Sequence, residues 1–192
     1  LSSPRDQDFI IYRGAALKLS TADLDLSYLR SAKVLVFGSV SLSGEGREAV
    51  LDAVRRAGDS GVLVAYDANL RPALWPDMGA ARQGILEGLQ DVAVCKLNAV
   101  ELELLAGTDD PAIGSRLLLE RGVKLCLVTL GSGGAYFNNG RAEGHVPAFD
   151  VEAVETTGCG DAFLAGLISG LLETSLQPET LDEASLRRLG WR

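Results

Sequence analysis

The stretch VLVAYDANLRPALWPDMGAARQGILEGLQDVAVCKLNAVELELLAG, residues 62–107, decides the fold class of this chain. It contains two short and mainly apolar runs, 62–67 and 92–98, and each is followed by a helical pattern, 78–90 and 99–107. Strand, helix, strand and helix in this order are typical of an α/β fold, in which crossover helices join parallel strands. Because the runs are apolar along most of their length, we expect both faces of these strands to be covered.

The same alternation continues outward in both directions along the chain. Further strands are expected at 8–12, 33–38 and 124–131, further helices at 46–61, 111–122 and after Asp161, and a hairpin with an Asn139–Gly140 turn at 133–146. No linker, repeat or low-complexity segment divides the sequence. We therefore expect one α/β unit over residues 1–192, with a mostly parallel central sheet.

Composition and charge exclude several classes of protein. The chain has 192 residues and a net charge of -8, and binding to nucleic acid would need a basic face. It has no apolar run of about 18 residues, so no membrane helix is indicated. The three cysteines, Cys95, Cys126 and Cys159, lack metal-site spacing, and we infer a reducing cytoplasm. The chain does not begin with Met, and we expect a portion of a longer protein.

A possible site for chemistry lies in ETTGCGDAFLAGLISGLLE, residues 155–173, just before an apolar helical run. Gly158 and Gly160 allow a positive φ and a close approach to a ligand, and the first N–H groups of a helix have no partner within it. With Cys159 they predict an anion hole for a phosphate, beside which Asp161 could accept a proton from a hydroxyl. The alternative is a helix start with a stabilising acid and a tight turn, and a glycine-rich loop alone does not decide.

The nine residues ETTGCGDAF resemble the C-terminal signature of the PfkB (ribokinase-like) carbohydrate kinases, D-T-T-G-A-G-D-x-F. The sequence departs from it at two positions, where Glu155 keeps the charge of Asp and Cys159 is small enough to leave the backbone donor in place. Four further segments resemble the family in the same order, so the resemblance covers nearly the whole chain. It implies a three-layer αβα sandwich around a mostly parallel sheet.

Two of these segments concern the phosphates. KLNAVELELL, residues 96–105, resembles the family's N-x-x-E motif, which implies that Asn98 and Glu101 organise Mg²⁺ through oxygen ligands and waters. The alternative is an N-cap Asn with a surface Glu. LVTLGSGGAYF, residues 127–137, resembles the nucleotide-binding strand and turn, with a plain hairpin as the alternative. The residues implied in binding ATP are Thr129, Gly131, Gly133, Gly134 and Lys96.

The other two segments concern the sugar. YDANLRPALWP, residues 66–76, resembles the D-x-N-x-R-x-x-L-W segment of the fructokinase and 2-keto-3-deoxygluconate kinase branches. Residues 36–43 also fit the fructokinase-like branch. The residues implied in binding the sugar are Asp67, Asn69, Arg71, Asp161 and, from FIIYRGAAL, Arg13. An Arg offers a planar fork of donors to a sugar, although a surface ion pair is the alternative for both arginines.

The resemblance implies ATP-dependent phosphorylation of a sugar hydroxyl, with ATP and Mg²⁺ as cofactors and Asp161 as the base. Fructose is the expected acceptor, with 2-keto-3-deoxygluconate or another sugar as the alternative. The family's N-terminal strands, its small β lid and its last helices have no counterpart in the sequence, so we expect a partial domain. Whether this portion is active alone, and whether the complete protein is a homodimer, stay open.

Two other classes of protein compete with a kinase. A dinucleotide-binding oxidoreductase would need a G-x-G-x-x-G turn between its first strand and helix, and the chain has none there. A non-catalytic interaction protein or an inactive remnant on the same fold is the second rival. Asp161 argues against that rival, because an interaction protein has no need of a base at this place.

Overall fold

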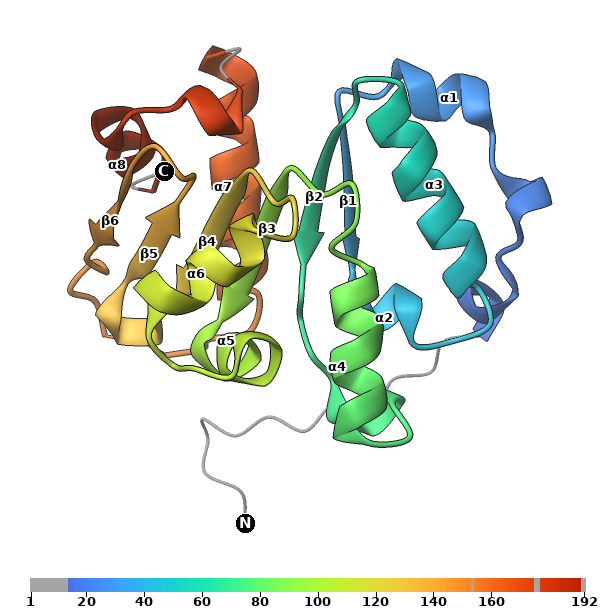
Figure 1. The fold of residues 1–192 in the computed structure, drawn as a ribbon, viewed down its shortest axis with the longest axis horizontal. Helices are drawn as coiled ribbons and strands as arrows, with labels where there is room; N and C mark the ends of the chain where they lie inside the picture. The colour runs from blue at the N-terminus through green and yellow to red at the C-terminus, as the bar shows by residue number, and fades with distance from the viewer. Residues whose placement is uncertain (1–13, 153, 175–176, 191–192) are drawn as a thin grey trace.

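The computed structural model describes residues 14–152, 154–174 and 177–190, and their centre is one six-stranded sheet (Figure 1). The strands lie in the order of the chain: β1 (Val34–Gly38), β2 (Leu63–Asp67), β3 (Val94–Asn98), β4 (Leu125–Thr129), β5 (Ala135–Asn138) and β6 (Glu143–Val146). The first four are parallel, and β5 and β6 extend the sheet as an antiparallel hairpin. The mostly parallel sheet expected from the sequence is confirmed, and the strand predicted at 8–12 lies outside the described residues.

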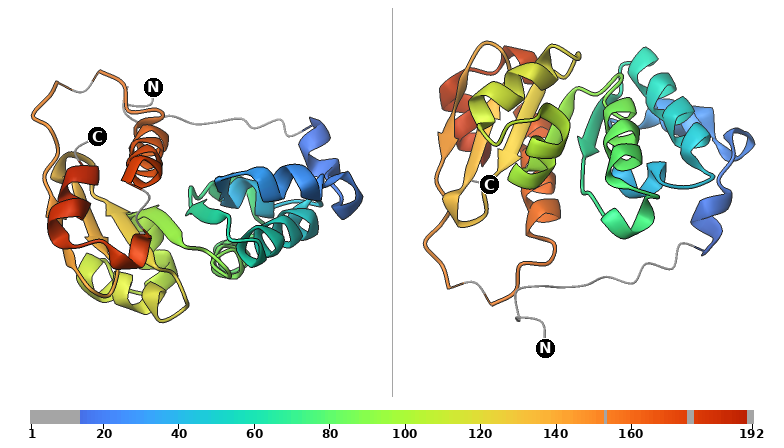
Figure 2. Two further views of the ribbon diagram at one scale, coloured as in Figure 1. Left: turned by 90° about the horizontal axis from the view of Figure 1, so that it is seen from above. Right: turned by 60° about the horizontal axis from the view of Figure 1, so that its bottom comes forward.

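Helices cover both faces of the sheet. They are α1 (Leu26–Ser31), α2 (Ser39–Leu42), α3 (Arg47–Asp59), α4 (Met78–Glu87), α5 (Ala99–Ala106), α6 (Pro111–Leu119), α7 (Cys159–Thr174) and α8 (Glu183–Gly190). Seen from above, α7 lies on one side of the sheet while α5 and α6 lie on the other (Figure 2). This arrangement is the three-layer αβα sandwich that the resemblance implied. Among the described residues, no helix has the length and apolar character needed to cross a membrane.

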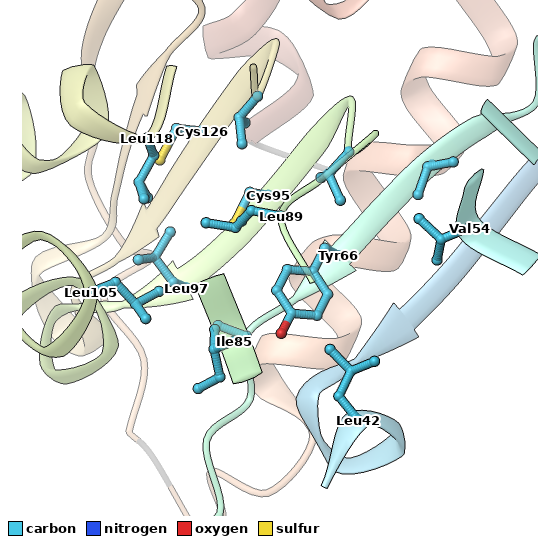
Figure 3. Packing of buried hydrophobic residues seen from close by; sticks show 14 of the residues in the cluster. Leu42, Val54, Tyr66, Ile85, Leu89, Cys95, Leu97, Leu105, Leu118 and Cys126 are labelled. Carbon is cyan, nitrogen blue, oxygen red and sulfur yellow. The ribbon is translucent and has the colours of Figure 1, made fainter. Parts of the chain in front are cut away.

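Two apolar clusters, one on each face, hold the layers together. Tyr66 is fully buried on the face covered by α4, where it lies near Ile85 and Leu42 (Figure 3). Cys95 and Cys126 belong to the same cluster, and both are buried free thiols. On the other face, Leu164, Leu167 and other residues of α7 pack on the sheet. Alternate residues of each buried strand thus face opposite clusters, which explains why these strands are apolar almost throughout.

Helix and turn boundaries follow from local chemistry. Gly107, with φ +74°, ends α5 and donates its N–H to the Glu103 carbonyl at 2.9 Å. The hairpin turns at Asn139 and Gly140, as predicted, and Gly140 has φ +79°. α7 begins at Cys159 rather than after Asp161, because Gly158 takes φ +79° and the Ala162 N–H already reaches its carbonyl at 2.8 Å. Asp161 therefore lies in the first turn of this helix.

Replacing Gly134 by Ala is expected to lower the free energy of unfolding of the complete protein by at least about 2 kcal/mol. Gly134 has φ +93°, and a Cβ there would lie 2.1 Å from the Val146 carbonyl oxygen, a backbone atom that cannot move aside. Urea denaturation measures the loss. Gly107→Ala is the matched control, because its φ is also positive but nothing lies within 4 Å of the added Cβ. Equal losses in the two variants would show that backbone strain, and not the overlap, sets the cost.

Candidate active site

The polar residues predicted for the site lie where the parallel strands end. Register pairs Gly38 with Asp67 and Asp67 with Lys96, and two residues further along β3 it pairs Asn98 with Thr129, so these residues lie at the ends of four neighbouring strands. Ligands of open α/β sheets bind beyond the carboxyl ends of the strands, which is this edge. The sheet therefore brings together the sugar-side and phosphate-side candidates that the sequence separates by many residues.

The start of α7 lies at this edge and carries Asp161 in its first turn, where the residue is exposed. The Cys159 N–H donates to the Thr156 carbonyl at 3.2 Å, so in this structure that N–H of the predicted anion hole is engaged within the turn. Glu155 accepts the Thr157 N–H at 2.8 Å. This contact shows what the acid before the glycines does locally: it fixes the turn that leads into the helix.

A cavity of about 350 Å³ joins α7 to the ends of β1 and β2. Its polar lining comes from Asp67, Asn69 and Asp161, three residues that the sequence assigned to the sugar side. The rest of its lining is Val36, Phe37, Gly38, Leu164, Ala165 and Ile168. Ligand sites combine apolar walls with a few placed polar groups, and this volume lies within their usual range of about 300–1,000 Å³.

Lys96 and Asp67 form a buried ion pair beside this cavity. The Lys96 ammonium lies 3.0 Å from both carboxylate oxygens of Asp67, and each residue is only 6% exposed. Burial raises the pKa of Asp67, the Lys96 charge opposes that rise, and the charge of Asp161 adds to it. A Cβ on Gly160 would lie 2.5 Å from Lys96 Nζ, so the ammonium packs against the first turn of α7. Positive charge is thus held at the helix start, where a phosphate would bind.

Asn98 and Glu101 form a reciprocal cap at the start of α5. Asn98 Oδ1 accepts the Glu101 N–H at 2.9 Å, and Glu101 Oε2 accepts the Asn98 N–H at 2.8 Å. The second Glu101 oxygen, Oε1, accepts the Leu70 N–H at 2.7 Å. Glu101 is 3% exposed, so it is not the surface residue of the alternative interpretation. Burial raises its pKa, while the two backbone N–H groups lower it.

This pair leaves few lone pairs open for direct coordination of Mg²⁺. Both Glu101 oxygens and Asn98 Oδ1 already accept backbone N–H groups, whereas Mg²⁺ needs near-octahedral oxygen ligands that are open to it. In the described part of the chain, no group of three or more His, Cys, Asp or Glu residues could hold a metal ion. The oxygens of the motif are committed to the backbone in this structure.

Comparison with known proteins decides the family. The chain matches the model of the pfkB family carbohydrate kinases over residues 1–188. It belongs to the pfkB family. Fructokinase-1 of Oryza sativa subsp. japonica is 38% identical over 191 residues, which are 96% of this chain and 59% of that protein. The chain thus spans little more than half the length of the curated relatives that it matches.

Solved structures of two kinases agree with the fold. The aminoimidazole riboside kinase from Salmonella enterica, complexed with aminoimidazole riboside and an ATP analog, has a TM-score of 0.79 and 30% identity over 94% of this chain and 59% of its own. The fructokinase from Vibrio cholerae O395, in a form with fructose, ADP and calcium ion bound, has a TM-score of 0.72 and 26% identity over 87% and 55% of the two chains. These likenesses confirm the ribokinase-like architecture.

The remaining candidates of this pfkB site lie outside the cavity lining. Thr129 ends β4 beside Asn98, and Gly131 and Gly133 follow it in the 3₁₀ turn η4 (Gly131–Gly133), with Gly134 directly behind. Arg71 donates from Nη1 to the Leu70 carbonyl at 3.1 Å. Arg13 lies outside the described residues. Apart from Lys96 on β3, the nucleotide candidates are therefore grouped on the β4 side, and the described sugar candidates on the β1–β2 side.

Sequence reasoning missed two features of the site. Leu164 and Ile168 pack in the apolar cluster between α7 and the sheet and also line the cavity, and nothing in an apolar helical run distinguishes those two roles. Lys96 and Asp67 were assigned separate roles, and the ion pair between them was not anticipated. A signal was available, since a Lys in a buried strand needs a buried partner. Its partner could not be named without the strand register.

Proposed function

We propose that the complete protein transfers the γ-phosphoryl group of ATP to a sugar hydroxyl, with fructose as the acceptor. The observation that carries this proposal is the meeting of Asp161, Asp67 and Asn69 in one cavity, beside the ammonium of Lys96 at the start of α7. Membership of the pfkB family supports the reaction class. Fructokinases among the relatives, and the fructose bound to the Vibrio cholerae enzyme, support the acceptor.

The proposed reaction uses few groups. Asp161 accepts the proton of the attacking hydroxyl, whose oxygen forms a bond to the γ-phosphorus while the bond from phosphorus to the β-phosphate oxygen breaks and ADP leaves. N–H groups at the start of α7 and the Lys96 ammonium stabilise the charge on the transferred group. Phosphoryl transfer depends mainly on positioning and on such stabilisation. These few groups supply both kinds of contribution.

Binding of the two substrates is divided between the two sides of the site. Asp67 and Asn69 orient the sugar, with Arg71 and Arg13 as further contacts, while the apolar walls of the cavity exclude water. Residues 129–134 and Lys96 hold the nucleotide. ATP is used as its Mg²⁺ complex, in which the phosphates themselves supply oxygen ligands. The sugar candidates thus approach Asp161 from β2, and the nucleotide approaches it from β4.

Turnover of ATP with a panel of acceptors tests this function in the complete protein. The panel holds fructose, 2-keto-3-deoxygluconate, ribose, tagatose and aminoimidazole riboside; the last is included because the Salmonella enterica kinase has the higher TM-score of the two solved structures. We expect the highest kcat/KM with fructose. A higher value with another acceptor would replace fructose and keep the kinase. A folded protein that binds no ATP and turns over no acceptor would favour the non-catalytic interaction protein.

A further inference from the structure

The segment Ala68–Arg71, called the sugar loop here, follows β2 and presents Asn69 to the cavity. Its backbone is unusual at that residue. Asn69 has φ +35°, a left-handed conformation that is uncommon for a residue other than glycine. Such conformations persist where the surrounding structure holds them in place, and they gather at binding and catalytic sites. The sugar loop therefore needs contacts that fix it.

Three hydrogen bonds from other parts of the chain supply that fixation. The Ala68 N–H donates to the Lys96 carbonyl at 3.0 Å, and the Ser39 hydroxyl donates to the Asn69 carbonyl at 3.1 Å. The shortest is the bond from the Leu70 N–H to Glu101 Oε1 at 2.7 Å. It is also the one with an ionisable acceptor, and charge-assisted bonds are the strong ones.

Glu101 is built to hold this position. It is 3% exposed, and its other oxygen is tied to the Asn98 N–H at the start of α5. A buried carboxylate with both oxygens accepting from the backbone bridges two segments. The bridge runs from the end of β3, on the nucleotide side, to the sugar loop.

We propose that Glu101 is a positioning residue for the sugar: it holds the sugar loop in the conformation that presents Asn69 to the cavity. This inference rests on the proposed function. It differs from what the N-x-x-E resemblance implies, which is a role near Mg²⁺ and the phosphates. The two roles differ in what they predict for sugar binding without nucleotide and metal. Loss of a positioning residue weakens it, and loss of a residue that acts on Mg²⁺ leaves it unchanged.

Glu101→Gln in the complete protein separates the two roles. The Gln side chain has nearly the same size, but its NH₂ group must face one of the two backbone N–H groups, so one bond is lost. We expect the dissociation constant of fructose, measured by calorimetry with EDTA and without ATP, to rise about tenfold, because the binding-competent loop is less populated. The Mg²⁺ concentration for half-maximal turnover should stay within about twofold of wild type. Unchanged fructose binding with a shifted Mg²⁺ requirement would overturn the proposal.

Asp110→Ala is the matched control, because it removes the cap of another helix. Asp110 is an exposed acid at the start of α6 that accepts the Ala112 and Ile113 N–H groups at 2.8 and 3.1 Å, and it makes no contact with the sugar loop. Fructose affinity should not change in this variant. An equal loss in both variants would show that the effect of Glu101→Gln is a general loss of helix capping, and would overturn a specific role.

Hydrogen exchange tests the bridge without any sugar. In Glu101→Gln, peptides that contain Leu70 should exchange faster than in wild type, and in Asp110→Ala they should not. Unaltered exchange would overturn the bridge even if fructose proves to be the acceptor. Faster exchange in a protein that binds no fructose would contradict fructose as the acceptor but would still support the bridge that Glu101 forms to Leu70.

A second variant covers the case in which Glu101→Gln does not fold. Ser39→Ala removes a different contact to the same loop, the bond to the Asn69 carbonyl. We expect a several-fold loss of fructose affinity there too, smaller than that of Glu101→Gln because the lost bond is a neutral one. Unchanged affinity in Ser39→Ala would contradict the claim that the sugar loop must be held for binding.

Discussion

Asp161→Asn should lower kcat of the complete protein by about 10²–10⁴-fold, the usual contribution of a general base. An amide has the size of the carboxylate but cannot accept the proton of the attacking hydroxyl. Asp161 is exposed in the first turn of α7, so its charge contributes only about 0.3–1 kcal/mol to the helix, and the variant should fold. Initial rates of ADP formation at saturating ATP and fructose measure the effect.

The Michaelis constants distinguish a base from a binding residue. If Asp161 serves mainly as the general base, Asp161→Asn should change the KM values for fructose and ATP far less than it changes kcat. Asp182→Asn is the control, because Asp182 accepts the Ser185 N–H at 2.8 Å at the start of α8, away from the cavity. It should leave both constants at the wild-type level. Near wild-type turnover of Asp161→Asn would remove Asp161 from the role of base.

Much of the fold could be predicted from the sequence because its signals are local. Strands covered on both faces must be apolar almost throughout, and helices show their spacing within two turns. The sheet β1–β4 and its crossover helices therefore appear where the patterns predicted them. The reciprocal cap of Asn98 and Glu101 was also open to prediction as an N-cap, because a spacing of three residues fixes that contact.

The rest of the site depends on contacts between distant segments, which spacing does not determine. Leu70 and Glu101 are 31 residues apart, and Asp67 and Lys96 are 29 apart. Both contacts follow from the register of β2 against β3, where Asp67 pairs with Lys96. A slip of one residue would turn these side chains to the opposite face of the sheet. The burial of Glu101 has the same origin, which is why a surface position could not be excluded from the sequence.

Lys96→Met should lower the free energy of unfolding of the complete protein by about 3–5 kcal/mol, the usual cost of leaving a buried charge without its partner. Asp67 and Lys96 are each 6% exposed, and the ammonium lies 3.0 Å from both carboxylate oxygens. Met keeps the apolar stem but removes the charge, so the Asp67 carboxylate stays buried alone. Urea denaturation at pH 7 measures the loss. Lys124→Met, at an exposed lysine, should change stability by less than about 0.5 kcal/mol.

The loss of unfolding free energy in Lys96→Met should depend on pH, and the titration of Asp67 determines the direction of that dependence. Burial already raises the pKa of Asp67, and removal of the opposing Lys96 charge should raise it further. A carboxyl group whose pKa is raised on folding stabilises the folded state below its unfolded pKa of about 3.9, and this contribution is lost as the pH rises through its folded pKa. The deficit should therefore be largest at neutral pH and shrink towards pH 4. A deficit of constant size across that range would show that Asp67 is not its source.

The double variant Lys96→Met with Asp67→Asn separates stability from catalysis. With both charges gone, no buried charge lacks a partner, and most of the lost stability should return, as expected for two residues in contact. Turnover should not return. The ammonium that packs against Gly160 at the start of α7 is still absent, and the charge of the transferred phosphoryl group has lost that stabilisation. Because Asp67 is also proposed to orient the sugar, the kcat of the double variant at saturating fructose is compared with that of Asp67→Asn alone. A lower kcat in the double variant would assign the ammonium to the phosphate, and an equal kcat would mean that Lys96 serves the fold alone.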